Sequence, residues 1–441
     1  MRKKIIVMGP VATRSGYGNH TRDIVRSLIN ADKYDVQIVS MPWGDCPMTA
    51  LDPEKDADII SRIATTAINY QPDFHIQVSV PNEFQAYGKY NIGITAGIET
   101  TVCAPEWIEG CNRMDKIITV SEHSKKVFLD TVFDKVDDKT KQKVGELRVE
   151  KPVDVLFEGV DTDIFHKELN IKESVTEQLK GIPEKFAFLF VGHWLKGDIG
   201  QDRKDVGMLI KVFAEAFKNK PSRNKPALIL KTSGATFSIM DRDALMMRIS
   251  TILAPYGNKA PNVYLLHGDM TEEEINSLYN HPKVKAMVSL TKGEGYGRPL
   301  AEFGTSEKPI ITTDWSGHKD FLKPDCSILL PGKLTPVHAS AVDNHIRKEG
   351  QWFTVDYAVA AKAMHDVMEN YDRYKVGAKK QAEHINTNFS LEKMEEKLIE
   401  MIDAAAESIP QPVTLQLPKL KKVGESEMPK IQLPKLQKVE G

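Results

Sequence analysis

The sequence has few cysteines, no long apolar run and almost no net charge. Four cysteines occur among 441 residues, and no two of them form a C-x-x-C pair. We therefore expect a reducing compartment, the cytoplasm, and no structural zinc. No apolar run approaches the ~20 residues that a membrane-spanning helix needs. The net charge of −2 excludes a global basic field that would attract nucleic acid, although a local basic groove stays open.

Several catalytic signatures are missing as well. The chain contains no G-x-x-x-x-G-K-[ST] loop and no G-x-S-x-G turn, and its His, Cys and Asp residues show no metal-ligand spacing. A dinucleotide-binding fingerprint would need a further glycine after Gly16 and Gly18, but Thr21 stands at that position. These absences argue against a P-loop ATPase, a G-x-S-x-G hydrolase, an NAD-dependent enzyme and a metal site.

What the sequence does have is an alternation of short apolar runs with helical patterns. This alternation predicts an α/β fold of two doubly wound, Rossmann-like domains that face a central crevice lined by the carboxyl ends of strands. The predicted strands are 4–8, 36–40, 74–78, 91–96, 116–120, 153–156, 186–191, 227–230, 263–266, 286–289, 309–312 and 327–330. The predicted helices are 19–30, 55–69, 121–133, 205–217, 241–253, 272–279, 299–306, 355–368 and 391–406.

The same patterns divide the chain into four parts. They predict a first domain over 1–170, a second over 180–350, C-terminal helices over 351–408 and a disordered tail over 409–441. The tail holds the near-repeat QLPKL, at 416–420 and 432–436, and no periodicity that could bury a face. Residues 134–151 are charged with mixed sign, which predicts a surface excursion.

The most informative segment is Lys292-Gly-Glu-Gly-Tyr-Gly-Arg-Pro-Leu-Ala-Glu302, between a predicted strand and a predicted helix. Its glycines let the backbone pass close to a ligand and adopt φ > 0, and Pro299 suits the first turn of a helix. Free N–H groups at that helix end favour an anion. Glu294 and Glu302 can then point into the same crevice, where carboxylates suit sugar hydroxyls. The alternative is that Glu294 is a solvated loop acid and Glu302 a helix-surface acid.

A second candidate is the loop with Gly16 and Gly18, which follows the first predicted strand and opens a helix. Small residues there allow a phosphate or a hydroxyl to approach the helix N-terminus. A tight turn with a polar cap is the alternative.

Two further candidates carry charge. Arg203 and Lys204 precede a predicted helix and would clamp a diphosphate, Arg bidentately and Lys as a point charge. Composition alone favours the alternative that both are solvated surface cations. Glu99 follows the strand predicted over 91–96, where it would either orient an acceptor or cap the helix region over 105–111.

Together these segments resemble the family 4 glycosyltransferases, retaining enzymes of the GT-B type with two Rossmann-like domains. The likeness extends along most of residues 4–330 and is strongest over 263–322. The stretches that carry it are Tyr264-Leu-Leu-His-Gly-Asp269, Glu294-Gly-Tyr-Gly-Arg-Pro-Leu-Ala-Glu302, Pro309-Ile-Ile-Thr-Thr-Asp314, Val120-Ser-Glu-His-Ser124, Glu158-Gly-Val-Asp-Thr-Asp-Ile-Phe165 and 99–125. One departure is His193, because the family often has Arg just after the glycine at this strand end.

The resemblance implies transfer of a sugar from a nucleotide-sugar donor to an acceptor hydroxyl, with retention of configuration and without a metal or other cofactor. The first domain would take the acceptor and the second the donor, and the C-terminal helices over 351–408 would fold back on the first domain. Glu302 would hold the ribose hydroxyls, and Arg203 with Lys204 would neutralise the leaving diphosphate. Donor contacts are implied for Glu294 and the amides of Gly295, Tyr296 and Gly297, for the base-binding strand with His267 and Gly268, and for the loop of Gly16 and Gly18.

No pattern in the sequence identifies the acceptor or the donor sugar. One expectation is a glycan, lipid-linked or small-molecule acceptor. Another is DNA with a hydroxymethylated base, as in phage enzymes that modify their genomes, and the compartment would then be the cytoplasm of the host. The QLPKL copies loosely resemble Gln-Leu motifs that dock on replication sliding clamps, and two copies would add avidity. A solubilising tail is the alternative there. A non-catalytic sugar-nucleotide-binding or scaffold protein on the same fold is the alternative from another class.

Overall fold

The structure is a computed structural model that describes residues 2–409 except 138, 195 and 235. The described residues form one compact unit that ends at Ile409. The sequence-based predictions for the tail, its disorder and the docking of its QLPKL repeats, concern residues outside the described range.

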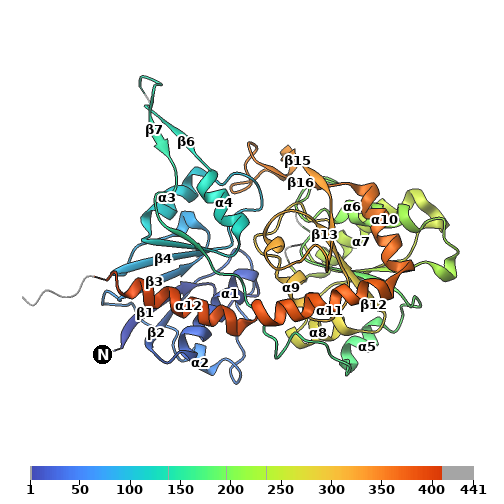
Figure 1. Ribbon diagram of the computed structural model, residues 1–441, viewed down its shortest axis with the longest axis horizontal. Coiled ribbons are helices and arrows are strands. Elements are labelled where there is room, and N and C mark those ends of the chain that lie inside the picture. Colours follow the sequence, from blue (N-terminus) through green and yellow to red (C-terminus); the bar gives the residue numbers. More distant parts are fainter. Residues whose placement is uncertain (1, 138, 195, 235, 410–441) are drawn as a thin grey trace, which may run out of the picture. The chain divides into compact units, whose positions relative to one another are not determined.

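Two six-stranded sheets, each entirely parallel, organise the described chain (Figure 1). In the first sheet the order is β2-β1-β3-β4-β5-β8, and in the second it is β11-β10-β9-β12-β13-β14. The strands of the first sheet are β1 Lys3–Gly9, β2 Tyr34–Ser40, β3 Phe74–Val78, β4 Tyr90–Thr95, β5 Lys116–Thr119 and β8 Val153–Val155. Those of the second are β9 Ala187–Val191, β10 Ala227–Lys231, β11 Val263–Leu266, β12 Val284–Val288, β13 Ile310–Thr313 and β14 Ile328–Leu330. The predicted fold class of two doubly wound domains is therefore confirmed.

Helices follow most strands, as the alternation of patterns predicts. The helices are α1 Gly16–Asn30, α2 Ala57–Ile60, α3 Pro105–Arg113, α4 Glu122–Asp130, α5 Glu173–Leu179, α6 Val206–Phe217, α7 Ile239–Leu253, α8 Glu272–Asn280, α9 Arg298–Gly304, α10 Tyr357–Glu369, α11 Tyr371–Asn388 and α12 Leu391–Ala406. Within the described ranges, none of these helices combines the length and the apolar character needed to cross a bilayer.

The strands form because they are short apolar runs that bury both faces. Every residue of β3 is buried, and so is almost all of β9, where Ala187, Phe188, Leu189 and Phe190 have no exposed surface. Strands covered on both sides read as continuous rather than alternating apolar runs, which is why the sequence marks them clearly.

The strand orders create a switch point in each sheet. The chain direction across the first sheet reverses between β1 and β3, and across the second between β9 and β12. In open α/β sheets, ligands bind at such points, outside the carboxyl ends of the strands. The loops after β1, β9 and β12 are therefore where a site is expected.

The family resemblance implies that the C-terminal helices fold back on the first domain, but in the structure they pack on both domains. Helix α10 packs on α6 and α11 on α9, both of the second domain, and α12 packs on α1 of the first (Figure 1). In α12, Asp403 accepts a hydrogen bond from the Tyr34 hydroxyl at 2.6 Å. The predicted boundary at residue 350 falls inside an antiparallel hairpin, because β15 (Gly332–Pro336) pairs with β16 (Gln351–Val355).

The predicted helix over 55–69 is wrong beyond its first turn. Only α2 is helical there, and the chain then extends beside β2, where Ile63 bridges to Ile38. Thr65 and Thr66 follow, and β-branched residues of this kind are poor helix formers. The predicted surface excursion over 134–151 contains a hairpin of β6 (Phe133–Val136) and β7 (Lys143–Leu147), which projects from the first domain (Figure 1).

Candidate active site

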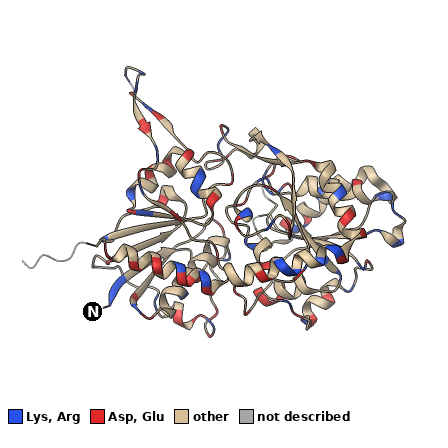
Figure 2. Ribbon diagram, viewed as in Figure 1, with Lys and Arg blue, Asp and Glu red and all other residues tan. Residues whose placement is uncertain are grey.

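Buried charges from both domains meet at the carboxyl ends of the strands. Elsewhere along the described ribbon, the positions of Lys and Arg are interspersed with those of Asp and Glu (Figure 2). Arg203 and Lys204 lie just before α6, and Glu294 lies between β12 and α9. Glu99 follows β4 of the first domain. These residues lie about 90 to 200 positions apart in the sequence. They meet in space because each follows a parallel strand or precedes a helix at the carboxyl-terminal edge of its sheet.

Lys204 and Glu294 form the shortest ion pair of this group. Lys204 Nζ lies 2.6 Å from both Oε1 and Oε2 of Glu294. Arg203 Nη1 lies 3.5 Å from Glu294 Oε2, and it donates to the carbonyl of Gly293 at 3.1 Å. The alternatives of a solvated loop acid and of solvated surface cations are thus wrong, since all three side chains are at most 15% exposed.

The electrostatics of this group keep Glu294 ionised. Burial by itself would raise the pKa of Glu294, but the charges of Lys204 and Arg203 outweigh burial and lower this pKa to about 2. Burial lowers the pKa of Lys204, and Glu294 opposes that effect. Arg203 has five N–H donors and Lys204 three, so donors remain for an anion beside Glu294.

Glu99 contacts the same cations rather than a helix end. Its Oε1 lies 3.0 Å from Arg203 Nη1. The residue before α3 is Ala104, which caps α3 without a side-chain hydrogen bond. The idea that Glu99 caps the helix over 105–111 is therefore wrong, and its role toward an acceptor stays a prediction.

The glycines of the Glu294 segment allow the two domains to approach closely. A Cβ added at Gly295 would lie 2.7 Å from the carbonyl oxygen of Ala96, which is closer than real side chains come. A Cβ at Gly293 would clash with the backbone of Glu99. Gly297 has φ of +99°, as the pattern predicts for a turn into α9. Tyr296 is buried, and its ring packs against Phe321.

The backbone of Glu294 is also held by the loop after β13. The amide of Glu294 donates to Ser316 Oγ at 2.9 Å, and the amide of Gly317 donates to the Glu294 carbonyl at 3.0 Å. Ser121 of the first domain donates to the Gly295 carbonyl at 2.5 Å. Three hydrogen bonds from two segments of the chain therefore fix the Glu294 segment.

Glu302 is buried in a second charged cluster. Arg298 Nε donates to Glu302 Oε1 at 2.9 Å, and the Tyr279 hydroxyl lies 3.3 Å from Oε2. Arg298 Nη1 also donates to Asp23 of α1 at 2.6 Å, so this arginine joins α9 to the first domain. Burial raises the pKa of Glu302 to about 7, against the opposing charge of Arg298. The alternative of a helix-surface acid is thus wrong.

Sequence reasoning missed several members of this cluster. Asp23 and Arg298 form the pair across the domains, and Glu158 is buried nearby with a pKa that burial raises to about 7. His20 is buried as well, and burial lowers its pKa to about 4. Glu158 and Arg298 stand inside stretches that carry the family resemblance, and His20 stands in the segment that begins at Gly16 and Gly18. Asp23 lies farther along the same amphipathic helix and had no such signal.

The loop before α1 shows two kinds of glycine. A Cβ at Gly18 would clash with the carbonyl of Thr13, so this glycine serves packing. A Cβ at Gly16 would meet nothing within 4 Å. Ser15 caps α1 by accepting from the Gly18 amide at 3.0 Å, so the polar cap of the alternative interpretation is present. Gly16 is left free for close approach of a ligand.

Two histidines of the second domain lie just after strand ends, His193 after β9 and His267 after β11. His267 Nε2 lies 2.8 Å from Asp241 Oδ2, and Gly268 has φ of +122°. His193 Nδ1 lies 3.2 Å from Ser233 Oγ, and burial lowers the pKa of His193, as do Lys204 and Arg203.

A polar cavity of about 500 Å³ lies between these loops. Gly16 and Arg14 line it from the loop before α1, and His193 and Asp269 line it from the second domain. Its size falls within the range of small-molecule sites. Of the predicted site residues, Gly16 lines this cavity, while Glu99, Arg203, Lys204 and Glu294 form one charged group and Glu302 belongs to a second. The contacts of all these residues with a donor stay a prediction.

Comparisons with known proteins bear on the fold. No protein-family model matches the chain, and no curated protein matches it in sequence. Among solved structures, a glycosyltransferase from Rickettsia africae ESF-5 is similar with a TM-score of 0.63 and 14% identity, over 91% of this chain and 98% of that one. Sucrose-phosphate synthase from Thermosynechococcus elongatus is similar with a TM-score of 0.61 and 13% identity, over 92% of this chain and 100% of that one.

A third similar structure is HepE from Anabaena in complex with UDP and glucose, with a TM-score of 0.57 and 12% identity, over 91% of this chain and 100% of that one. Identities this low show the fold alone. The described chain therefore has the two-domain GT-B fold that these glycosyltransferases share.

Proposed function

We propose that this protein is a retaining glycosyltransferase that moves a sugar from a nucleotide-sugar donor to an acceptor hydroxyl without a metal. The observation that carries the proposal is the buried group of Arg203, Lys204 and Glu294 at the switch point of the donor domain, whose cations lower the pKa of His193 in the wall of the polar cavity. The similarity to HepE, whose structure contains UDP and glucose, supports the choice of donor class.

In the proposed reaction, the bond between the sugar C1 and the diphosphate oxygen breaks. A bond from C1 to the acceptor oxygen forms on the same face, and the acceptor proton passes to the departing diphosphate. Arg203 and Lys204 stabilise the charge that grows on that diphosphate, with the N–H donors that Glu294 and Glu99 leave free. The free energy needed to reorganise Arg203 and Lys204 during the reaction is small, because Glu294 and Glu99 already hold these cations in place.

Glu294 would accept hydrogen bonds from the hydroxyls of the donor sugar. The backbone amides of Gly295, Tyr296 and Gly297 would contact the same sugar. Glu302 would accept from the ribose hydroxyls. A carboxylate offers about four acceptor positions, and Arg298 and Tyr279 use two of them at Glu302. Glu99 belongs to the acceptor side of the crevice.

A thermal-shift screen of nucleotide sugars, followed by transfer assays, tests the proposal. The acceptor arms are DNA with hydroxymethylated bases and simple glycans, and the anomeric configuration of the product is read by NMR. Lys204→Ala should lower the transfer rate by about 100-fold or more, whereas Lys126→Ala, on an exposed helix face, should leave it unchanged. Binding of a nucleotide sugar without transfer to any acceptor would favour the non-catalytic alternative.

A further inference from the structure

Among the described residues, no crossover helix lies on the face of the first sheet that carries Ile6, Met8 and Val39. In place of a crossover helix between β2 and β3, the chain from Ser61 to Asp73 is extended or irregular. Sheet faces in parallel α/β folds are covered on both sides. Ile6, Met8 and Val39 therefore face a hollow rather than a packed helix.

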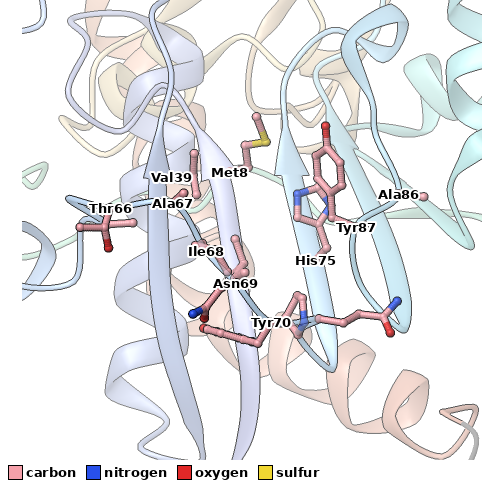
Figure 3. A pocket seen from close by; sticks show the side chains of 14 residues that line it. Met8, Val39, Thr66, Ala67, Ile68, Asn69, Tyr70, His75, Ala86 and Tyr87 are labelled. Carbon is pink, nitrogen blue, oxygen red and sulfur yellow. The ribbon is translucent and has the colours of Figure 1, made fainter.

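This hollow is a cavity of about 670 Å³ (Figure 3). The volume lies within the ~300–1,000 Å³ that small-molecule sites occupy. Among its fourteen lining residues, all of them described, none is Asp, Glu, Lys or Arg. None of them lines the crevice described above. A charged ligand would find no counter-charge on these walls, so the lining suits an uncharged molecule.

A buried histidine provides a hydrogen-bonding group in this apolar wall. His75 of β3 is 1% exposed, a backbone hydrogen bond with Gln85 opposes the effect of burial on its pKa, and no side chain among the described residues bonds to either ring nitrogen. Burial lowers the pKa of His75 to about 4, so the ring is neutral at pH 7 and carries one N–H donor and one bare acceptor nitrogen. A buried polar group without a partner costs about 1–3 kcal/mol, so a ligand that supplies the partner gains affinity.

Two tyrosines complete the walls. The ring of Tyr87 packs edge-on against His75, with centroids 5.3 Å apart, and both lie opposite Val39 and Ala67 (Figure 3). Tyr70 is fixed at the mouth, because its hydroxyl donates to Gln37 at 2.9 Å and Lys4 Nζ lies 4.3 Å from its ring centroid. Aromatic walls of this kind favour a flat ring, which they contact by stacked or edge-on packing.

We propose that this cavity binds an uncharged aromatic or heteroaromatic molecule whose N–H or O–H group donates to His75. The site is separate from the glycosyl-transfer crevice, so it stands whether or not the proposed activity is found.

The test uses a pair of probes that differ by one donor. We expect 5-fluoroindole to bind the full-length protein in ¹⁹F NMR titrations, and 5-fluoro-1-methylindole, which lacks the N–H group, to bind about fivefold more weakly. In His75→Phe, which keeps a flat ring but no nitrogen, the two probes should bind equally. Ala86→Trp places a large side chain at an exposed lining position and should abolish binding of both.

Each of the following results would overturn the proposal. No binding of 5-fluoroindole, or equal affinity of the two probes for the unmodified protein, would overturn the proposal and leave a solvated groove. Binding that survives Ala86→Trp would do the same, because the probe would then occupy another place. The comparison of the two probes needs no variant, so it holds even if His75→Phe fails to fold.

Discussion

Lys204 and Glu294 show at the scale of single residues how burial changes what a charge does. On a surface, an ion pair of this kind contributes little, since water screens it. Here both side chains are at most 12% exposed, so each one depends on the other. Removal of one partner from a buried pair typically costs about 3–5 kcal/mol, because the other charge is left uncompensated.

Lys204→Met should therefore lower the free energy of unfolding by about 3 kcal/mol at pH 7. The pKa of Glu294, about 2, lies below its ordinary value of 4.5. The stabilisation by this carboxylate is thus fully present above about pH 4.5 and is lost as the pH falls toward 2. Urea unfolding at pH 7, 4 and 3 should show the two proteins converging as the pH falls. Lys126→Met, in an exposed pair with Asp130, is the control and should change little.

The pKa of Glu302 is shifted in the opposite direction from that of Glu294, and it predicts a pH dependence of ligand binding near neutral pH. Its pKa of about 7 means that it is protonated below pH 7 and is a carboxylate above it. If the carboxylate holds ribose hydroxyls, nucleotide affinity should rise about tenfold from pH 6 to pH 8, because only the ionised fraction binds. Calorimetry with the nucleoside diphosphate that stabilises the protein best would measure this rise.

Glu302→Gln is the matched control for that experiment. It keeps the shape of the side chain and removes its titration, whereas the diphosphate titrates equally in both proteins. The difference between the two pH profiles therefore reports Glu302. Parallel profiles would contradict the ribose role.

At the scale of elements, glycines at the two turns of the crevice serve different purposes. Gly16 opens α1 with free space around its Cα, and Gly295 precedes α9 with the Ala96 carbonyl against it. Gly16→Ala should stabilise the fold slightly, by up to about 1 kcal/mol, since it reduces the entropy of the unfolded chain in the first turn of a helix. It should weaken nucleotide binding if the loop lies over phosphates.

Gly295→Ala should instead destabilise the protein by about 1–3 kcal/mol, the usual cost of inserting a group where no space exists. Thermal unfolding of both variants, with and without nucleotide, measures the contrast. Equal destabilisation by the two substitutions would show that this assignment of the glycines is wrong.

At the scale of the whole molecule, Arg298 ties the domains together through Asp23. Asp23→Asn removes one of its two carboxylate partners and leaves Glu302, so the free energy of unfolding should fall by about 2–3 kcal/mol, below the cost of an entirely unpaired charge. Hydrogen exchange in α9 should become faster, because the contact with α1 is weakened. Asp32→Asn, in an exposed pair with Arg2, is the control. Unchanged exchange in α9 would argue against this tie.

Prediction from the sequence succeeded where a signal was local. Strands buried on both faces were found within a few residues, and β3 (Phe74–Val78) within its observed bounds. The two glutamates and the cation pair were found because each lies beside a strand end or a helix start. The helix over 55–69 failed because the pairing of Ile63 with Ile38 replaced its local preference. The ion pair between Arg298 and Asp23 was missed because the two residues lie 275 positions apart in the sequence.

The sequence by itself determined the fold class and the candidate residues, since periodicity, turn residues and a Gly-rich segment act over a few neighbouring positions. The tertiary structure decided which charges are buried, which partners they have and therefore which forms they adopt. Glu294 and Glu302 stand eight positions apart, yet the pKa of one is about 2 and that of the other about 7. Only the fold produces that difference, because it places two cations against Glu294 and shares the single cation Arg298 among several carboxylates.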